Sequence, residues 1–454
     1  MSQAGLFNHN HTIIEEARIH NEFHSENILS MLSLYEFTES LSSPTIYGSM
    51  IIHDSNNILN NRFFDTSGEN YVTIRIKNVS DEVFEYTFVL ADIEIEIKGD
   101  LADSAVVQLS LISKDFFKNS YTFRSRGYIN LTISEIVSKI LKEELSSEVP
   151  IENIGDPKFY TKEGESTVTF AFTKIRPFEK IDILKQQAFG ESDDISSTFM
   201  FYETRKGYNF RSFEDIITDS HFNTKVVTYV YSENMAMNKF QNPMFLGIKS
   251  FEPTTRNNNL NKIVNGMFSS EVFRFDFNTK RVTVKEFNLN DDYSKFSKVE
   301  NNIDNKIKIT SKFTDDVREN GKYTYFIPWD SSDGRNDMTF KHFQYSRPFS
   351  NMLMENTLNI FVDGNLSLNL GDSINVKIWK NQDRHVKTEN YEDERYSGKY
   401  IIQGMNNTVY RGNMPGIWYH DTSISLTRDT TPTIDSVPTP VKTLNNNLLY
   451  INQG

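Results

Sequence analysis

Alternating apolar and polar residues dominate the last third of the chain, between residues 358 and 429. Residues 358–362, 366–370 and 374–378 each carry an aliphatic side chain at every second position. Asp363 and Gly364 stand between the first two runs, where a tight hairpin needs residues that accept positive φ. The pattern predicts four or five antiparallel strands with one buried face, which form a small barrel or sandwich.

A similar pattern occurs near the N-terminus. Residues 68–78 read Gly-Glu-Asn-Tyr-Val-Thr-Ile-Arg-Ile-Lys-Asn, and residues 371–381 read Gly-Asp-Ser-Ile-Asn-Val-Lys-Ile-Trp-Lys-Asn. Each is a Gly-acid turn followed by an alternating strand and Lys-Asn, but the apolar positions are offset by one residue. Two related barrels in one chain would produce this match, and recurrent turn chemistry alone would also produce it.

The rest of the pattern divides the chain into regions. Alternating strands predict a first barrel over residues 28–117, after an N-terminal arm of residues 1–27. Helical spacing predicts an α+β domain over residues 118–243, with a capping box at 132–135, a helix from Pro177 and a hairpin that turns near Lys206-Gly207. Residues 244–288 and 351–430 are assigned to a second, discontinuous barrel, residues 289–350 to a polar and irregular insertion, and residues 431–454 to a linker and tail. The predicted fold class is therefore mainly β, with an α+β middle domain and two related antiparallel β-barrels.

The N-terminal arm carries four of the nine histidines: His9, His11, His20 and His24. A short helix over residues 12–23 would place His20 and His24 one turn apart. A metal site there would need a carboxylate or Cys partner that the arm does not supply in a recognisable spacing. The arm is predicted to be a mobile or docking segment.

Composition narrows the class of protein. A chain of 454 residues with 38% hydrophobic residues, 35 Phe and 21 Tyr can fill the cores of about three domains. The absence of cysteine excludes disulfides, thiolate metal sites and Cys nucleophiles, and fits synthesis in a reducing cytoplasm. No signal peptide and no membrane segment are expected from the pattern. The net charge of −13 disfavours nonspecific binding of duplex DNA.

Catalytic motifs are missing from the sequence. It contains no nucleophile elbow, phosphate-binding P-loop, dinucleotide fingerprint or zinc-protease helix. Residues 330–337 look like part of a calcium loop but lack its ligand spacing and closing glutamate, so a solvated turn is expected. A glycosidase pair among the 61 carboxylates stays open. No catalytic, cofactor-binding or metal-ligating residue and no cofactor is predicted.

Several stretches, taken in order, resemble one family. Residues 40–55, Ser-Leu-Ser-Ser-Pro-Thr-Ile-Tyr-Gly-Ser-Met-Ile-Ile-His-Asp-Ser, look like the opening of the first barrel of baseplate hub proteins from contractile-tailed bacteriophages. Residues 177–188 followed by 199–212 are similar to the helix and hairpin of their middle domain. Residues 265–276 and 398–405 resemble the two ends of their second barrel. The likeness spans roughly residues 30–430, and the arm, the insertion and the tail depart from it.

The resemblance implies a non-enzymatic structural protein of the virion, the central hub of the tail baseplate, made in the host cytoplasm. It implies a homotrimer with two barrels of tail-tube type per chain, so that six barrels match a hexameric tube above and a trimeric spike below. The implied partners are further copies of the chain, tail-tube or tube-initiator proteins, the central spike, the tape-measure protein and other baseplate proteins. A lumen would let DNA pass without specific nucleic-acid binding.

Three alternatives remain at this stage. The spike or hub protein of a type VI secretion-like injection machine shares the implied fold. A tail-associated cell-wall hydrolase would need a cleft with two positioned carboxylates. A carbohydrate-binding module would need clustered tryptophans, whereas Trp329, Trp379 and Trp418 are scattered along the chain.

Overall fold

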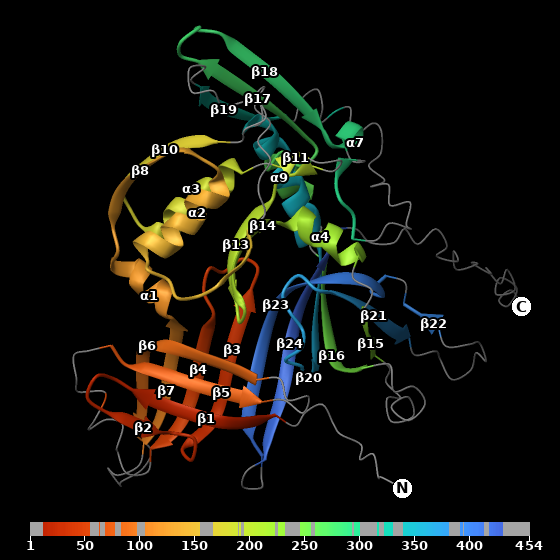
Figure 1. The fold of residues 1–454 in the computed structure, drawn as a ribbon. Helices are drawn as coiled ribbons and strands as arrows, with labels where there is room; N and C mark the ends of the chain where they lie inside the picture. The colour runs from red at the N-terminus through yellow and green to blue at the C-terminus, as the bar shows by residue number, and fades with distance from the viewer. Residues whose placement is uncertain are drawn as a thin grey trace, which may run out of the picture.

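Strands dominate the fold, and most of them belong to one sheet of fourteen strands (Figure 1). The computed structural model describes residues 12–54, 63, 69–77, 83–97, 105–154, 167–188, 190–191, 195–222, 226–231, 246–255, 259–292, 295–299, 316, 322–329, 339–380, 391–393, 395–412 and 417–429. The large sheet curves into two barrels that lie side by side at one end of the molecule. The prediction of a mainly β fold with two barrels is confirmed.

The first barrel contains six strands in the order β1-β5-β6-β7-β4-β3, each antiparallel to its neighbour. Inward-facing side chains of alternate residues fill one buried core. Ile28 N, in the segment that leads into β3, donates a hydrogen bond of 2.8 Å to Ala17 O of β1. The strands are Ile13–His20 (β1), Leu32–Ser40 (β3), Tyr47–Asp54 (β4), Tyr71–Lys77 (β5), Val83–Ile97 (β6) and Ala105–Ser113 (β7), with the short Ser25–Asn27 (β2) beside β1.

The second barrel contains six strands in the order β15-β21-β23-β24-β20-β16, and pairing of β15 with β16 closes it. β15 runs parallel to both neighbours, so this barrel is not wholly antiparallel as predicted. Apolar alternation is the same for either strand direction, so the sequence pattern could not reveal this. The strands are Val227–Tyr231 (β15), Leu246–Thr255 (β16), Asn356–Asp363 (β20), Ser373–Lys380 (β21), Gly398–Arg411 (β23) and Trp418–Arg428 (β24), with Tyr391–Glu392 (β22) beside β21.

The two barrels have the same connectivity. In both chain order and spatial order, β1, β3, β4, β5, β6 and β7 correspond to β15, β16, β20, β21, β23 and β24. Irregularities also match: β6 and β23 shift register at residues 90–92 and 402–404, and β3 and β16 shift at residues 32–34 and 248–250. Because a β-bulge is a specific local feature, these coincidences identify the barrels as structural repeats.

The repeat seen in the sequence is real, but its alignment differs by one residue from the match of the two glycines. A backbone hydrogen bond from Leu90 N to Asn70 O in the first barrel has its counterpart from Ile402 N to Asp372 O in the second. Asn70 is therefore equivalent to Asp372. The shift removes the offset between the apolar positions, so that the buried residues of β5 and β21 coincide.

An α+β domain with its own core lies over the first barrel (Figure 1). Its capping box is confirmed, because Thr132 Oγ1 accepts a hydrogen bond from Glu135 N and Glu135 Oε2 accepts one from Thr132 N. The predicted start of α3 at Pro177 is also confirmed. Its elements are Lys114–Tyr121 (α1), Arg124–Leu131 (β8), Ile133–Lys139 (α2), Ile140–Glu144 (a π-helical turn), Ile151–Ile154 (β9), Val168–Ile175 (β10), Pro177–Gln187 (α3), Gly190–Glu191 (β11), Ile195–Ser196 (β12), Phe199–Thr204 (β13), Gly207–Ser212 (β14) and Phe213–Phe222 (α4).

A separate three-stranded sheet stands at the opposite end of the molecule from the barrels (Figure 1). It contains Ser269–Asp276 (β17), Val282–Asn288 (β18) and Tyr323–Trp329 (β19), and the short helices Asn259–Val264 (α6) and Leu289–Asp292 (α7) flank its first two strands. The helix Thr339–Glu355 (α9) follows, and its Tyr345, Phe349 and Met352 enter the core of the second barrel. No helix within the described ranges is both long and apolar enough to cross a bilayer.

Three assignments made from the sequence are corrected here. β17 pairs with β18 on one side and with β19 on the other, so β17 and β18 do not join the second barrel. The described part of the predicted irregular insertion contains α7, β19 and the first part of α9. β15 belongs to the second barrel and not to the α+β domain. Periodicity identifies strands but not their partners, because strand pairing is decided by contacts between residues distant in sequence.

The predicted helix over residues 12–23 is also wrong. Residues 13–20 form β1, which pairs along its length with β5. Ile14, Ala17 and Ile19 enter the first core, and barrel packing outweighs the weak local preference for a helix. The first barrel therefore begins within the region that the sequence assigned to an arm. Residues 1–11, including His9 and His11, lie outside the described residues, as do residues 430–454.

The tight hairpin expected at Asp363-Gly364 is absent. β20 ends at Asp363, and the next residues cross between the barrels without forming a strand. Leu366 enters the first core, whereas Leu368 and Leu370 enter the second. The alternating leucines are thus buried by two cores at once, a pattern that resembles that of a strand.

Gly364 is predicted to tolerate no side chain. A Cβ there would lie 2.0 Å from Cγ of His420, whose ring is buried and held by Thr12 and Asn407 at 3.0 and 3.1 Å. Gly364→Ala should lower the free energy of unfolding by about 1–3 kcal/mol in urea. Gly127→Ala is the matched control, because the nearest atom to its Cβ would be 3.9 Å away. Equal stability of the two variants would contradict this packing.

Candidate assembly interface

The two barrels are joined edge to edge by one antiparallel ladder between β3 and β23. Residues 34–40 of β3 pair with residues 404–410 of β23, so both barrels belong to one continuous sheet. Val409 and Trp418 from the second barrel pack into the first core. Backbone pairing and a shared core together fix the position of one barrel against the other.

The tip of the β13–β14 hairpin is wedged into this junction. Arg205 forms an ion pair of 3.0 Å with the buried Glu39 of β3, and its guanidinium donates to the carbonyl oxygens of Leu366 and Leu368. The hairpin turn was predicted from the sequence, but its contact with both barrels was not. One side chain thus connects the α+β domain, the first barrel and the segment that crosses between the barrels.

A buried carboxylate lies two residues before this arginine. Glu203 is fully buried and accepts hydrogen bonds from the hydroxyl of Tyr86 and, at 3.3 Å, from Ile46 N, both in the first barrel. Burial raises the pKa of Glu203 to about 8; the hydrogen bonds from Tyr86, Ser113 and Ile46 lower it, and the nearby Asp115 raises it. At neutral pH the group is held mainly as the neutral acid, which suits a dry contact between two domains.

Both barrel cores lie on one face of the joined sheet, and most side chains of the opposite face are polar, with Tyr47, Phe361 and Tyr419 as exposed exceptions. One row of paired residues crosses seven strands from β6 to β20 on that face: Asp92, Ser110, Ser49, Glu36, Thr408, Asp421 and Asp363. Thr408 Oγ1 donates to Glu36 Oε1 at 3.2 Å across the junction between the barrels. The surface is therefore continuous over both barrels.

Negative charge predominates on this polar face. Glu94 and Glu252 add further exposed carboxylates, because they pair with Gln108 and Asn359 of the same face. Lys249 is held between Asp421 at 2.5 Å and Asp363 at 2.9 Å. Burial opposes the ammonium charge, but the hydrogen bonds to Asp421 and Asp363 raise the pKa of Lys249 overall. The lysine neutralises part of a face that otherwise repels phosphate.

The joined sheet ends in two open edges. In β6, residues 92–97 pair with β7 on one side, and no described strand pairs with their other side. In β16, residues 250–255 pair with β20 on one side, and the described residues again supply no second neighbour. Among the described residues, therefore, no strand covers the backbone N–H and C=O groups at the two ends of this eight-strand surface.

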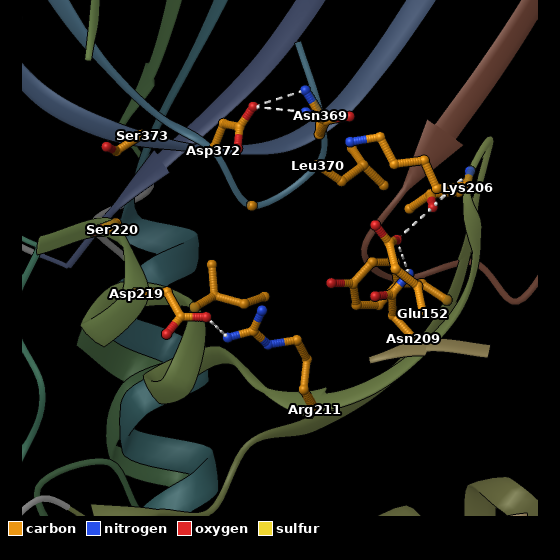
Figure 2. A pocket seen from close by; sticks show the side chains of 14 residues that line it. Glu152, Lys206, Asn209, Arg211, Asp219, Ser220, Asn369, Leu370, Asp372 and Ser373 are labelled. Carbon is orange, nitrogen blue, oxygen red and sulfur yellow. Dashed lines mark hydrogen bonds and ion pairs between the residues drawn. The ribbon is translucent and has the colours of Figure 1, made fainter. Parts of the chain in front are cut away.

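A polar cavity of about 210 Å³ lies under the hairpin, between α4 and the residues before β21 (Figure 2). Its carboxylates already have partners. Asp219 pairs with Arg211, Asp372 accepts from Asn369, and Glu152 accepts from Asn209. Lys206 extends from the hairpin into the same space. The arrangement holds the hairpin against the second barrel and offers no carboxylate pair set apart for general acid and base chemistry.

The histidines considered as metal ligands have structural contacts in the first barrel. His20 stacks on Tyr71 with ring centroids 5.6 Å apart, and His24 lies against Phe63, so both serve the first barrel. The described residues contain no group of three or more His, Asp or Glu side chains that could hold a metal ion. The calcium-like residues 330–337 lie outside the described ranges.

Comparison with solved structures finds phage tail proteins and type VI secretion components. A tail protein from Neisseria meningitidis matches with a TM-score of 0.49 and 10% identity, over 91% of this chain and 96% of that one. The 43 kDa tail protein of prophage MuSo2 from Shewanella oneidensis matches with 0.49 and 10%, over 92% and 100%. A type VI secretion component of E. coli, described as similar to T4 tail proteins, matches with 0.43 and 8%, over 92% and 76%. No protein-family model and no curated protein matches the chain.

Removal of the wedge arginine should destabilise the protein. Arg205→Ala leaves Glu39 buried without its counter-charge, which should cost about 3–5 kcal/mol in a chemical unfolding experiment followed by tryptophan fluorescence. Arg126→Ala is the control, because Arg126 and Glu143 form an exposed pair and its loss should cost under about 1 kcal/mol. If the Arg205 variant is as stable as the control, the contacts of Arg205 do not stabilise the junction between the two barrels.

Glu203 should make stability fall as pH rises. Its pKa is about 8 in the folded protein and near 4.5 when unfolded, so between these values only the folded state keeps the proton. The stabilisation is complete below about pH 4.5 and is lost as pH rises through about 8. Thermal unfolding of Glu203→Gln and wild type at pH 5 and pH 9 should show a smaller drop for the variant. Identical drops would contradict the assignment.

Proposed function

We propose that the chain is a non-enzymatic structural protein of a phage tail, the trimeric central hub of its baseplate. One observation carries the proposal: two barrels of the same connectivity are joined in one sheet, and no described strand pairs with the outer edges of that sheet. The matched solved structures are of the kind that the sequence resembles, but the proposal rests on the geometry of the sheet.

Duplication of a barrel solves a symmetry mismatch. Three chains with two barrels each present six similar units to a hexameric tail tube, while the whole ring keeps threefold symmetry for a trimeric spike. Further copies of this chain, tube or tube-initiator proteins, the spike, the tape-measure protein and other baseplate proteins are the partners of this proposal. The protein would reside in the tail baseplate of the virion.

The polar face of the joined sheet would line the lumen of the ring. Eight strands per chain extend from β6 to β16, so three chains would supply twenty-four. Barrels of about 16 strands already enclose an aqueous channel, and a larger number widens it. Carboxylates on the lining would repel the DNA backbone, which favours passage over binding.

The spike or hub of a type VI secretion-like machine is the second candidate, because it would use the same ring. Co-purification of the chain with tube proteins from phage tails and from type VI secretion machines distinguishes the two candidates, because the chain should bind the tube protein of its own machine. A cell-wall hydrolase would need two free carboxylates in a cleft, and those of the described polar cavity are engaged. Clearing of a wall-polymer gel by the pure protein would favour the hydrolase.

The mass of the protein in solution tests the proposal. Light scattering behind a sizing column should give three times 52.7 kDa, and negative-stain microscopy should show a ring with a central hole. Interfaces of such obligate assemblies bury more than about 2,000 Å², so the trimer should persist on dilution to micromolar concentration. A stable monomer that forms no ring at any concentration tested would overturn the hub assignment.

A further inference from the structure

The two open edges of the sheet are the structural equivalents of the two edges that are paired inside the chain. The shared bulges align β6 with β23 so that residues 92–97 match 404–409. They also align β16 with β3 so that residues 250–255 match 34–39. Residues 404–410 and 34–40 form the ladder between the barrels. The open edges are therefore equivalent to the two strands of that ladder, but they are not paired with each other within the chain.

We propose that β16 of one chain pairs with β6 of a second copy, antiparallel and in the register of β3 with β23. This joint rests on the proposed ring and names the strands that close it. Transfer of the internal register gives five described pairs. They place Thr255, Thr254, Pro253, Glu252 and Phe251 of one chain opposite Ile93, Glu94, Ile95, Glu96 and Ile97, respectively, of the neighbouring copy.

A second copy of this chain fits these edges for three reasons. The edges are the equivalents of two edges that already pair with each other, they lie at opposite ends of one sheet, and an antiparallel joint between them continues the alternation of strand directions. Such a joint is heterologous, so a repeated step closes into a ring when its rotation allows. Each chain then contains one joint internally and makes one with each neighbour.

The edges also carry residues that disfavour nonspecific pairing with strands of other proteins. Pro253 has no N–H to donate, and proline is characteristic of edge strands. Asp92 and Glu94 place charge along the other edge, which is exposed at both residues. The joint should therefore be weaker than the internal ladder and should depend on both edges being correctly aligned.

Disulfide trapping tests the register, and the chain contains no cysteine to interfere. Opposed residues in an antiparallel ladder have Cα atoms about 4.5–5.5 Å apart, within the range that a disulfide spans. Glu94→Cys and Thr254→Cys are placed on two copies of the chain that are co-expressed, so that both variants assemble into the same rings, and the purified mixture is oxidised mildly. A covalent dimer should form in the mixture, and a chain carrying both substitutions should yield covalent trimers on a non-reducing gel.

Two controls use the same chain. Thr38→Cys with Asn406→Cys is the equivalent pair of the internal ladder and should form a disulfide within one chain, seen as a faster-running monomer. Ser250→Cys lies on the same face as Thr254 but four residues away, so its mixture with Glu94→Cys should give no dimer above background.

The outcomes separate this inference from the proposed function. A trimer by light scattering whose Glu94 and Thr254 variants never cross-link would refute the joint and leave the hub intact. Equal cross-linking through Ser250 and Thr254 would refute the register. Absence of any oligomer at the concentrations of the cross-linking experiment would count against the ring and the joint together.

Discussion

Edge strands of a β-sheet expose backbone hydrogen-bonding groups, and the need to pair or protect them governs the architecture of this chain. Each barrel has two strands, β6 and β3 in the first and β23 and β16 in the second, whose ends extend past their neighbours on one side. Those ends can pair with a strand from another barrel. Inside the chain, β3 and β23 satisfy each other. Among the described residues, the equivalent edges of β16 and β6 have no strand beside them, and the proposed assembly would pair them between chains.

A ring built from repeated joints needs a rigid step between its units. Rigidity here comes from buried polar contacts as well as from the ladder. Arg205 with Glu39 at the junction and Lys180 with Glu144 inside the α+β domain are buried ion pairs at 3.0 and 2.6 Å. Buried ions are costly to desolvate and contribute little net stability, so their value lies in fixing geometry, which loss of one partner would destroy.

The two barrels are related without being identical. Their strand order and bulges agree, but β15 runs opposite to its counterpart β1, and α9 covers only the core of the second barrel. In a ring of three such chains, the strands common to both barrels would be repeated six times. Elements that only one barrel carries, such as α9, would be repeated three times. The same sheet can thus present a repeated inner face while the outer parts distinguish alternate barrels.

The sequence by itself determined most strands of the two barrels, the two helix starts, the hairpin and the existence of a repeat, because these depend on periodicity and local turn chemistry. It did not determine which strands pair: β1 was read as a helix, β17 and β18 were placed in the wrong sheet, and the leucines of residues 366–370 were read as a strand. It also gave no sign that Arg205 reaches Glu39 or that the carboxylates of distant strands share one face. These features arise from contacts between residues far apart along the chain, and only the tertiary structure brings those residues together.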